Sequence, residues 1–316
     1  MPGCVGRRYR EPVATGSVDE FQAQRGRMFG LAYRLLGSAE EAEDVVQDAY
    51  LRWSAADHAA IIAVPAWLAR VVTNLCLNRL TSARARRERY AGPWLPEPVA
   101  TADGALGPLD TAEQRESVSL AMLTLLERLT PVERAAFVLR ESFGYSHREI
   151  AAILDVSEAN GRQHYRRAVL RLGDSGARFA PDMGQWRRLV ERFLRAAGEG
   201  DLGALEQMLA EDVVTWSDGG GKARAGRRPV VGRANVARLL ALGLAKYGTD
   251  VRVAMAEVNG APAVIGHRGG RLMGVLVVDV ADGRVSALRA VLNPEKLRYL
   301  EEQLPELSHP AVGPGS

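Results

Sequence analysis

Apolar residues recur at every third or fourth position over residues 17–90, which is the spacing of amphipathic helices. Three such stripes begin after Ser17, after Ser38 and after Pro65. In four places a Ser or Thr stands three residues before a Glu, the pattern of an N-terminal capping box: Ser17–Glu20, Ser38–Glu41, Thr130–Glu133 and Ser146–Glu149. The pattern predicts an all-helical bundle over residues 17–90, preceded by a loosely packed N-terminus at 1–16.

Two breaks in this periodicity divide the rest of the chain. Residues 91–110 contain four prolines and three glycines without an apolar period, which predicts a linker. Helical spacing returns over 111–175, and residues 176–184 form a second, shorter break. From 185 to 305, two helices precede a strand-like segment, a third helix and four β-rich runs with Asn259-Gly260 and Asp282-Gly283 turns. This order predicts an α+β domain with a curved sheet wrapped over helices, followed by a flexible tail at 306–316.

Composition narrows the class of protein. The chain is 47% hydrophobic and 25% charged, and its net charge of +3 is too small for a uniformly basic coat. No apolar run reaches the roughly 18 residues that a membrane span requires. Its two cysteines, Cys4 and Cys76, are far apart and belong to no cluster of metal-ligating residues. We therefore expect a cytoplasmic protein without a disulfide framework, a metal site or a bound cofactor.

Residues 130–172 carry the strongest functional pattern. Helices over 131–142, over 146–154 and from Ser157 onward follow one another with helix-turn-helix spacing. On the last helix, the residues expected to pack inward are Gly161, Tyr165, Ala168 and Leu172. The opposite face carries side chains that pair with guanine and adenine edges: Arg162, Gln163, Arg166 and Arg167. The pattern predicts that this helix enters the major groove of DNA, and the alternative is a solvated arginine face on a structural helix.

Two further faces are strongly charged. The helix after Pro65 ends in an arginine run that suits a phosphate backbone: Arg84, Arg86, Arg87 and Arg89. On the helix after Ser38, the residues Glu41, Asp44 and Asp48 share one side, opposite the apolar stripe. DNA repels such a carboxylate face, whereas a basic protein surface attracts it. We therefore expect this acidic face to bind a protein and not a metal ion.

Three segments together resemble a bacterial sigma factor of group IV, the extracytoplasmic function (ECF) family. They are EEAEDVVQDAYLRW, VPAWLARVVTNLCLNRL and the helix-turn-helix LTPVERAAFVLRESFGYSHREIAAILDVSEANGRQHYRRAVLRL. The resemblance identifies residues 17–90 with sigma region 2 and residues 111–175 with sigma region 4. It implies a promoter-specificity subunit without catalytic activity of its own. Its partners would be promoter DNA and core RNA polymerase, through the β′ clamp helices and the β subunit.

The resemblance also assigns residues to these partners. Region 2.2 would dock on the β′ clamp through Glu41, Asp44, Gln47 and Asp48. The next part of region 2 would melt and read the −10 element, with a base flipped out of the stack, through Asn74, Asn78, Arg79, Arg84, Arg86 and Arg87. Region 4 would read the −35 element through Ser157, Arg162, Gln163, Arg166 and Arg167. One departure is Gly161, where the family usually has Val or Ala. A glycine at this position costs the helix about 1 kcal/mol.

The C-terminal extension is similar to that of one ECF subgroup, whose extra domain has a SnoaL-like fold of the nuclear transport factor 2-like superfamily. The motifs that carry this similarity are WLPEP at 94–98, DGGGK at 218–222 and NPEKL at 293–297. They mark as regulatory or interdomain the residues Trp94, Pro96, Glu97, Asp218, Gly219, Gly220, Gly221, Lys222, Asn293, Pro294 and Lys296. The similarity implies a fused regulator that needs no separate anti-sigma protein. It leaves open a small-molecule ligand in the C-terminal cavity, and whether the domain activates or inhibits.

Two other functions stay open at this point. A one-component regulator would bind DNA through the helix-turn-helix and sense a ligand through the C-terminal domain, but it leaves residues 17–90 without a task. SnoaL-like folds also include enzymes, for which the titratable candidates are Asp212, Asp218, His267 and Arg289. We expect Asp218 to lie in a surface loop and His267 at a strand end, which are positions that do not favour catalysis.

Overall fold

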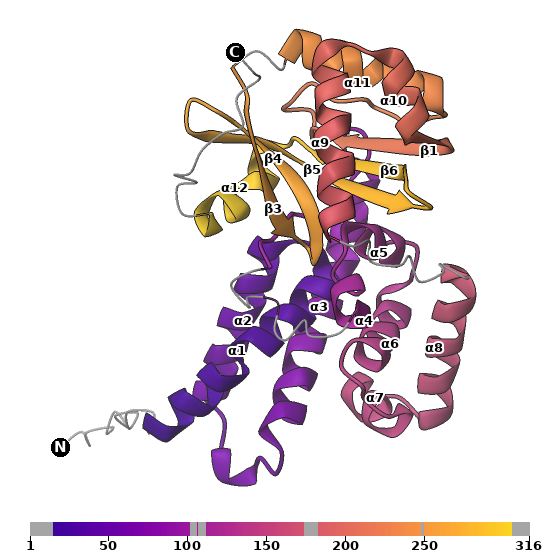
Figure 1. Cartoon of the computed structure of the whole chain (residues 1–316). Helices are drawn as coiled ribbons and strands as arrows, with labels where there is room; N and C mark the ends of the chain where they lie inside the picture. Colours follow the sequence, from indigo (N-terminus) through magenta and orange to yellow (C-terminus); the bar gives the residue numbers. More distant parts are fainter. Residues whose placement is uncertain (1–14, 102–105, 107–111, 174–182, 248–249, 305–316) are drawn as a thin grey trace, which may run out of the picture.

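The computed structural model describes residues 15–101, 106, 112–173, 183–247 and 250–304 (Figure 1). The predicted tails at 1–16 and 306–316 and the break at 176–184 therefore lie almost entirely outside the described residues. Two helical units occupy the lower half of Figure 1, and a sheet with its helices occupies the upper half. The predicted fold class, two all-α units and one α+β domain, is confirmed.

The first unit is a bundle of long helices: α1 (Thr15–Leu36), α2 (Ala39–Ser54), the short η1 (His58–Ala60) and α3 (Val64–Glu88). The apolar stripes of these helices meet in a core around the buried side chains of Phe29, Tyr33 and Trp53. The prediction that Ser17 caps the first helix is wrong, because α1 already begins at Thr15. No proline lies between Pro12 and Ser17, so nothing forces the helix to begin at the predicted cap, and the chain is helical two residues earlier even with Gly16 in its first turn.

The second unit contains the helix-turn-helix: α4 (Ala112–Glu116), α5 (Leu120–Leu126), α6 (Pro131–Glu141), α7 (His147–Leu154) and α8 (Glu158–Leu172). The capping boxes predicted at Thr130 and Ser146 are both formed. Asp155 ends α7 in the left-handed conformation, with φ of 56°, and so makes the turn into α8. The second unit shares one continuous hydrophobic core with the first, so the two units pack directly against each other.

The third unit is built on one six-stranded sheet. Its helices are α9 (Met183–Glu199), α10 (Leu202–Met208), α11 (Arg233–Tyr247) and α12 (Pro294–Gln303). Its strands are β1 (Leu209–Asp218), β2 (Val230–Val231), β3 (Arg252–Val258), β4 (Ala261–Arg268), β5 (Arg271–Ala281) and β6 (Arg284–Val291). They lie in the order β2-β1-β6-β5-β4-β3, with β1 parallel to β6 and every other pair antiparallel. The sequence did not predict the two-residue β2.

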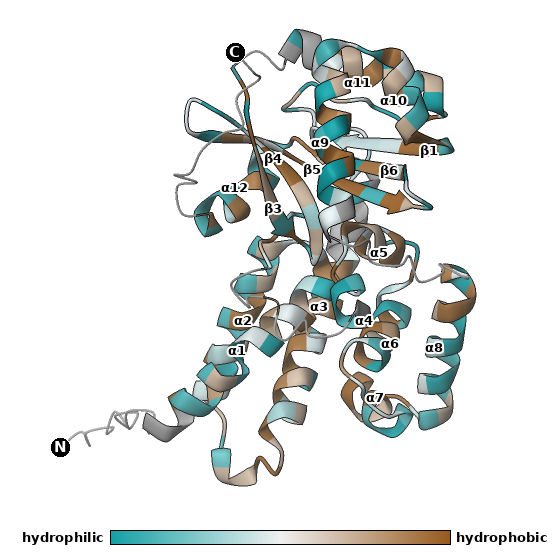
Figure 2. Ribbon diagram, viewed as in Figure 1, coloured by the Kyte–Doolittle hydropathy of each residue, from teal (hydrophilic) through white to brown (hydrophobic). Residues whose placement is uncertain are grey.

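Both faces of the sheet are covered, which is why its strands carry many hydrophobic residues (Figure 2). On one face, α9, α10 and α11 bury Trp186, Val190 and Phe193 against the sheet. On the other face, a separate cluster joins Val258 and Val277 of the sheet to the linker and to two helices. The partners are Leu95 of the linker, Leu120 of α5, and Leu297 and Leu300 of α12. The second face therefore binds the sheet to the two helical units.

Candidate functional site

Helix α8 has the two faces that the sequence predicted. Gly161, Ala168 and Leu172 are buried, and Tyr165 packs partly buried beside them. The four predicted readers of base edges are exposed: Arg162, Gln163, Arg166 and Arg167. Ser157 caps the helix by accepting a hydrogen bond from the Asn160 amide at 3.3 Å. The geometry suits a recognition helix.

The structure brings together three residues that the resemblance assigned to different partners. Arg79 of α3 lies against the acidic face of α2, with its guanidinium 3.2 Å from the Asp44 carboxylate and 2.8 Å from that of Asp48. These contacts join α2 to α3 in the first bundle. Asn78 is exposed and Asn74 half-buried on the same helix, whereas the side chains of Arg84 and Arg86 lie outside the described residues.

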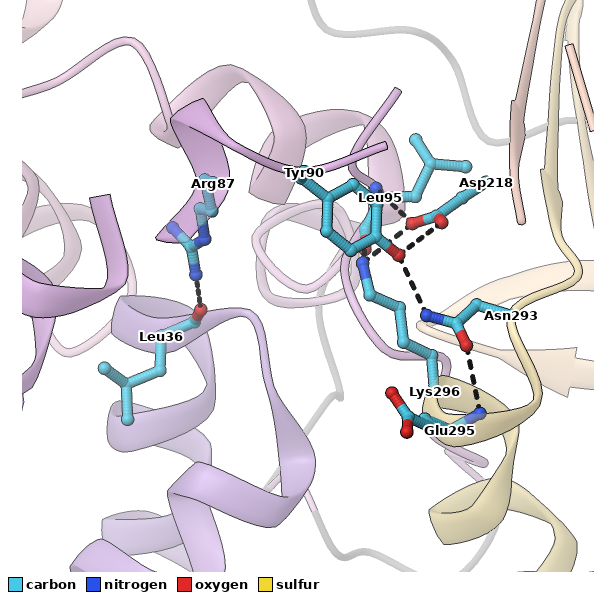
Figure 3. A network of polar contacts seen from close by, with 8 residues as sticks. All are labelled: Leu36, Arg87, Tyr90, Leu95, Asp218, Asn293, Glu295 and Lys296. Carbon is cyan, nitrogen blue, oxygen red and sulfur yellow. Dashed lines mark hydrogen bonds and ion pairs between the residues drawn. The ribbon is translucent and has the colours of Figure 1, made fainter. Parts of the chain in front are cut away.

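Arg87 was predicted to bind the −10 DNA, but its side chain points into the protein. It forms an ion pair with Glu127 of the second helical unit. Figure 3 shows its donation to the Leu36 carbonyl. Its guanidinium also lies 3.9 Å from the centre of the Trp94 ring. In this arrangement Arg87 joins the two helical units and is unavailable to a phosphate, which a sequence stripe of arginines does not reveal.

The outer strip of α2 is only partly open to solvent. Asp44 and Gln47 are exposed, and Leu51 beside them is 59% exposed. Helix α12 reaches the adjoining edge, where its Arg298 forms an exposed ion pair with Glu40 at 3.2 Å. Tyr299 of α12 donates to the Glu43 carboxylate at 3.2 Å and stacks on Phe29, with ring centres 5.8 Å apart. Sequence reasoning missed these α12 contacts, because exposed-looking Arg and Tyr on a short helix carry no signal of a partner.

The best-defined polar site lies where the end of α3, the linker and the third unit meet. We call it the Asp218 cluster, and it consists of Tyr90, Leu95, Asp218, Asn293 and Lys296 (Figure 3). The carboxylate of Asp218 accepts hydrogen bonds from the Tyr90 hydroxyl at 2.6 Å, the Leu95 amide at 2.8 Å and the Lys296 ammonium at 2.7 Å. Asp218 is completely buried at the end of β1, so the expectation of a surface loop is wrong. The linker and α12 cover it, and neither could be placed from sequence.

Lys296 and Asn293 complete the cluster from the first turn of α12. The Lys296 ammonium donates to the Leu95 carbonyl and lies 4.7 Å and 4.2 Å from the ring centres of Tyr90 and Trp94. Burial lowers the pKa of Lys296 to about 8. Asn293 caps α12, with Pro294 in the first turn, and its side-chain amide donates to the Tyr90 hydroxyl at 2.9 Å. All three sequence motifs thus meet at one carboxylate.

The glycines after Asp218 are needed for this close approach. Gly220 has φ of +58°, and a Cβ placed there would lie 2.8 Å from the Tyr90 hydroxyl and closer still to the Asn293 side chain. At Gly219 a Cβ would collide with the Ala223 carbonyl, and at Gly221 it would lie 3.3 Å from Ala91. Lys222 forms an exposed ion pair with Glu295 at the rim.

The linker motif reaches back to the start of α2. The Glu97 carboxylate accepts hydrogen bonds from the Ala39 amide at 2.7 Å and the Glu40 amide at 3.2 Å, and so caps α2 together with Ser38. Burial raises the pKa of Glu97. Pro96 and Leu95 are buried beside it. The linker is therefore held against region 17–90 at one side and against the third unit at the other.

A groove of about 450 Å³ opens along this junction. Its lining combines charged side chains with the Tyr90 and Trp94 rings and comes from Ser38, Glu40, Glu41, Arg87, Tyr90, Trp94, Glu97, Asn293, Glu295, Lys296 and Arg298. It lies between domains, and the ligand cavity inside the C-terminal domain stays a prediction.

The candidates for an enzyme site have separate partners. Asp218 binds the linker and Lys296, and Arg289 forms an ion pair with Asp279 below the Trp216 ring. Asp212 is exposed. Within the described residues, no group of three His, Cys, Asp or Glu side chains is placed to hold a metal ion. No described helix is long and apolar enough to cross a membrane.

Comparison with known proteins supports the assignment of the two helical units. The chain matches the family Sigma-70 region 2 over residues 21–86 and the family Sigma-70 region 4 over residues 119–172. The ECF RNA polymerase sigma factor SigJ of Mycobacterium tuberculosis is 39% identical over 293 residues, which are 88% of this chain and 92% of that protein. The probable ECF RNA polymerase sigma factor SigI of the same species is 31% identical over 291 residues, covering 90% and 96% of the two chains.

The likeness extends to the whole fold. The crystal structure of SigJ from Mycobacterium tuberculosis superposes with a TM-score of 0.70 at 35% sequence identity, over 89% of this chain and 98% of that chain. The matched part therefore includes the sheet unit as well as the two helical units.

Proposed function

The chain belongs to the extracytoplasmic function (ECF) family of RNA polymerase sigma factors, and we propose that its C-terminal domain controls when it engages polymerase and promoter DNA. Its function is in transcription initiation. We place region 2 in α1–α3, region 4 in α5–α8 and the C-terminal domain in 185–305. The observation that carries the proposal is the Asp218 cluster, which fixes the end of α3 and the linker to the C-terminal domain.

The exposed groups divide among three tasks in this proposal. Helix α8 reads the −35 element through Arg162, Gln163, Arg166 and Arg167, which project from its open face. Asn78, exposed on α3, contacts the −10 element together with Asn74. The strip of Asp44, Gln47 and Leu51 on α2 faces the polymerase clamp, because the Asp44 carboxylate, which also pairs with Arg79, matches a basic protein surface and not DNA.

Regions 2 and 4 are too close together here to read a promoter. The −10 and −35 elements are centred about 25 base pairs apart, or roughly 85 Å of B-form DNA. In the structure α3 packs on α7, and Arg70 of region 2 lies 4.0 Å from Asp155, beside the recognition helix. We call this arrangement closed, and promoter binding requires an open one in which the two regions separate.

The C-terminal domain also competes for the polymerase-binding helix. Arg298 and Tyr299 of α12 occupy Glu40 and Glu43, at the edge of the α2 strip that faces the clamp in this proposal. The fused domain thus takes the place of a separate anti-sigma protein. The groove beside α12 has room for a small ligand, which would act there by displacing the domain contacts.

The proposal is tested by reversing one charge on α12. Arg298→Glu places a carboxylate against Glu40, so we expect the full-length variant to bind core polymerase more tightly than the unaltered chain. Arg192→Glu makes the same charge change at an exposed position of α9 and serves as the matched control. Equal affinity of both variants for polymerase would overturn the competition. Transcript mapping with core polymerase and promoter fragments then shows whether tighter binding yields more starts at the same sites.

A further inference from the structure

The turn between β3 and β4 is largely buried, although hairpin turns normally face solvent. It consists of Asn259 and Gly260, with φ of 55° and 67°, the conformation of a tight hairpin turn. The turn between β5 and β6 has the same form, with Asp282 and Gly283 at 52° and 71°. Asp282 is exposed, as hairpin turns normally are, but Asn259 is completely buried. The Asn259 turn, as we call residues 259–260, is therefore inserted into another part of the protein.

The side chain of Asn259 forms its hydrogen bonds with residues outside its own hairpin. Its oxygen accepts from the Val99 amide at 3.0 Å. Its two N–H groups donate to the Tyr33 hydroxyl at 2.6 Å and to the Val118 carbonyl at 2.7 Å. Its backbone amide donates to the Val99 carbonyl at 2.9 Å. One side chain thus bonds three separate segments of the chain.

Those segments belong to three functional parts. Tyr33 lies in α1 of region 2, Val99 lies in the linker, and Val118 is the residue before the region 4 match begins. The adjoining contacts also join this hairpin to α4. Arg115 of α4 pairs with Glu257 of β3 at 2.8 Å, and a Cβ at Gly260 would lie 2.9 Å from the Arg115 carbonyl.

We infer that the Asn259 turn is a second interdomain contact, which holds the start of region 4 against region 2. This inference rests on the proposed control by the C-terminal domain and extends it to region 4. The described bonds of Asp218 reach the end of α3, the linker and α12. Those of Asn259 reach α1, the linker and the residue next to α5. Asn259 is a positioning residue, and the two contacts act on different regions.

The linker shows how the turn is seated. Ala100 forms an isolated antiparallel bridge with Val258, and the Thr101 hydroxyl accepts from the Gly260 amide at 3.2 Å. The linker therefore pairs with the edge strand β3 and covers backbone groups that an edge strand would otherwise expose. Separating region 4 from region 2 must break the bond of Asn259 to Tyr33 or its bond to Val118.

The test measures the distance between regions 2 and 4 in the full-length chain. Spin labels are attached to cysteines at Ala66 of α3 and Ala152 of α7, which are exposed positions on helices that contact each other. Cys4 is replaced by Ser, and Cys76 stays because it is buried. Asn259→Gly keeps the positive φ of the turn and removes all three side-chain bonds, and Asp282→Gly makes the matching change in the exposed turn.

We expect Asn259→Gly to increase the population of long label distances at least tenfold and to speed hydrogen exchange at the Val99 amide. Asp282→Gly leaves both at their original values. If Asn259→Gly keeps the original distances while Asp218→Asn opens the chain, the inference is wrong and the proposed function stands. If neither variant opens it, both fail. Should Asn259→Gly not fold, Asn259→Asp keeps an Asx residue in the turn but removes both side-chain N–H donors, and it decides by the same measurements.

Discussion

Replacing Asp218 by Asn should open the closed arrangement without changing the shape of the side chain. The carboxylate is completely buried and accepts three hydrogen bonds, one of them from the Lys296 ammonium. An amide in its place removes the charge and presents N–H groups to neighbours that are themselves donors. Lys296 then stays buried without a hydrogen-bonded carboxylate, because the remaining contacts of its ammonium are a carbonyl and two aromatic rings and Glu97 acts on it only electrostatically.

The magnitude follows from the burial of the pair. Removing one partner of a buried ion pair typically costs about 3–5 kcal/mol. If water hydrates Asp218 and Lys296 in the open state, the substitution destabilises the closed state alone by this energy. The ratio of closed to open molecules then falls by roughly two to three and a half powers of ten, at about 1.4 kcal/mol for each tenfold change. Affinity for core polymerase rises until the open form predominates, because apparent affinity scales with the fraction of competent molecules.

The assay is a titration of labelled full-length protein with core polymerase, read by fluorescence anisotropy. Lys222→Ala is the control, because it breaks the ion pair with Glu295 at the rim of the same interface, where the two side chains are 48% and 60% exposed. Such a pair contributes at most about 1 kcal/mol, so the control should shift the affinity less than about fivefold. Asp218→Asn binding no more tightly than Lys222→Ala would refute the reasoning. A lower melting temperature of Asp218→Asn, without tighter binding, would not support the reasoning.

Three further outcomes follow from the structure. Arg166→Ala should weaken binding to −35 DNA by about 1–3 kcal/mol and relax base preference, which a gel-shift series over single-base variants measures; unchanged preference contradicts the assignment. Gly161→Ala should raise the free energy of unfolding by up to about 1 kcal/mol, since a Cβ there meets the Ala151 side chain at an ordinary 3.6 Å, and denaturant unfolding checks the sign. Raising the pH from 7 to 9 should favour the closed state by up to about tenfold. The reason is that the pKa of Lys296 is about 8 in the closed state but about 10.4 when the side chain is exposed. The label distances, with Lys296→Met as the variant that should lose this dependence, report it.

The sign of that pH effect comes from proton counting. Below pH 8 the ammonium is protonated in both states, so the equilibrium does not move. Between the pKa of the closed state and that of the exposed amine, the open state holds more protons. A rise in pH therefore favours the closed state over this interval, and the effect levels off above the pKa of the exposed amine.

The sequence predicted the elements better than it predicted their partners. Capping boxes, the helix-turn-helix and the Asx-Gly hairpins are local patterns, and the structure forms them at Thr130, Ser146, Asn259 and Asp282. The exposed face of α8 was equally predictable, because helical periodicity alone decides which side chains face out. Ser17 shows the limit of such patterns, since a capping box is a tendency at helix ends and not a stop signal.

The environment of single polar residues was not predictable, since it depends on how the units pack. Asp218 beside three glycines has the local pattern of a surface loop, yet the linker and α12 bury it. Arg87 belongs to an arginine run that suits DNA, yet it pairs with Glu127 of another unit. Residue similarity to a family marked the motifs around Asp218 and Lys296 as interdomain, but it gave neither their bonds nor any role for Asn259.

The chemistry of both interdomain contacts suits an interface that opens. Asp218 and Asn259 are buried among hydrogen-bonding partners, and water can satisfy all of these groups when the domains separate. The net gain from each hydrogen bond on closing is therefore only about 0.5–1.5 kcal/mol, or up to about 3 with a charged group. Losing one partner while the rest stays buried costs more, so the contacts are selective for a complete match. The apolar clusters that join the same units would be exposed on opening, so polymerase must cover them in the open state, whereas water can hydrate the polar groups of these two contacts.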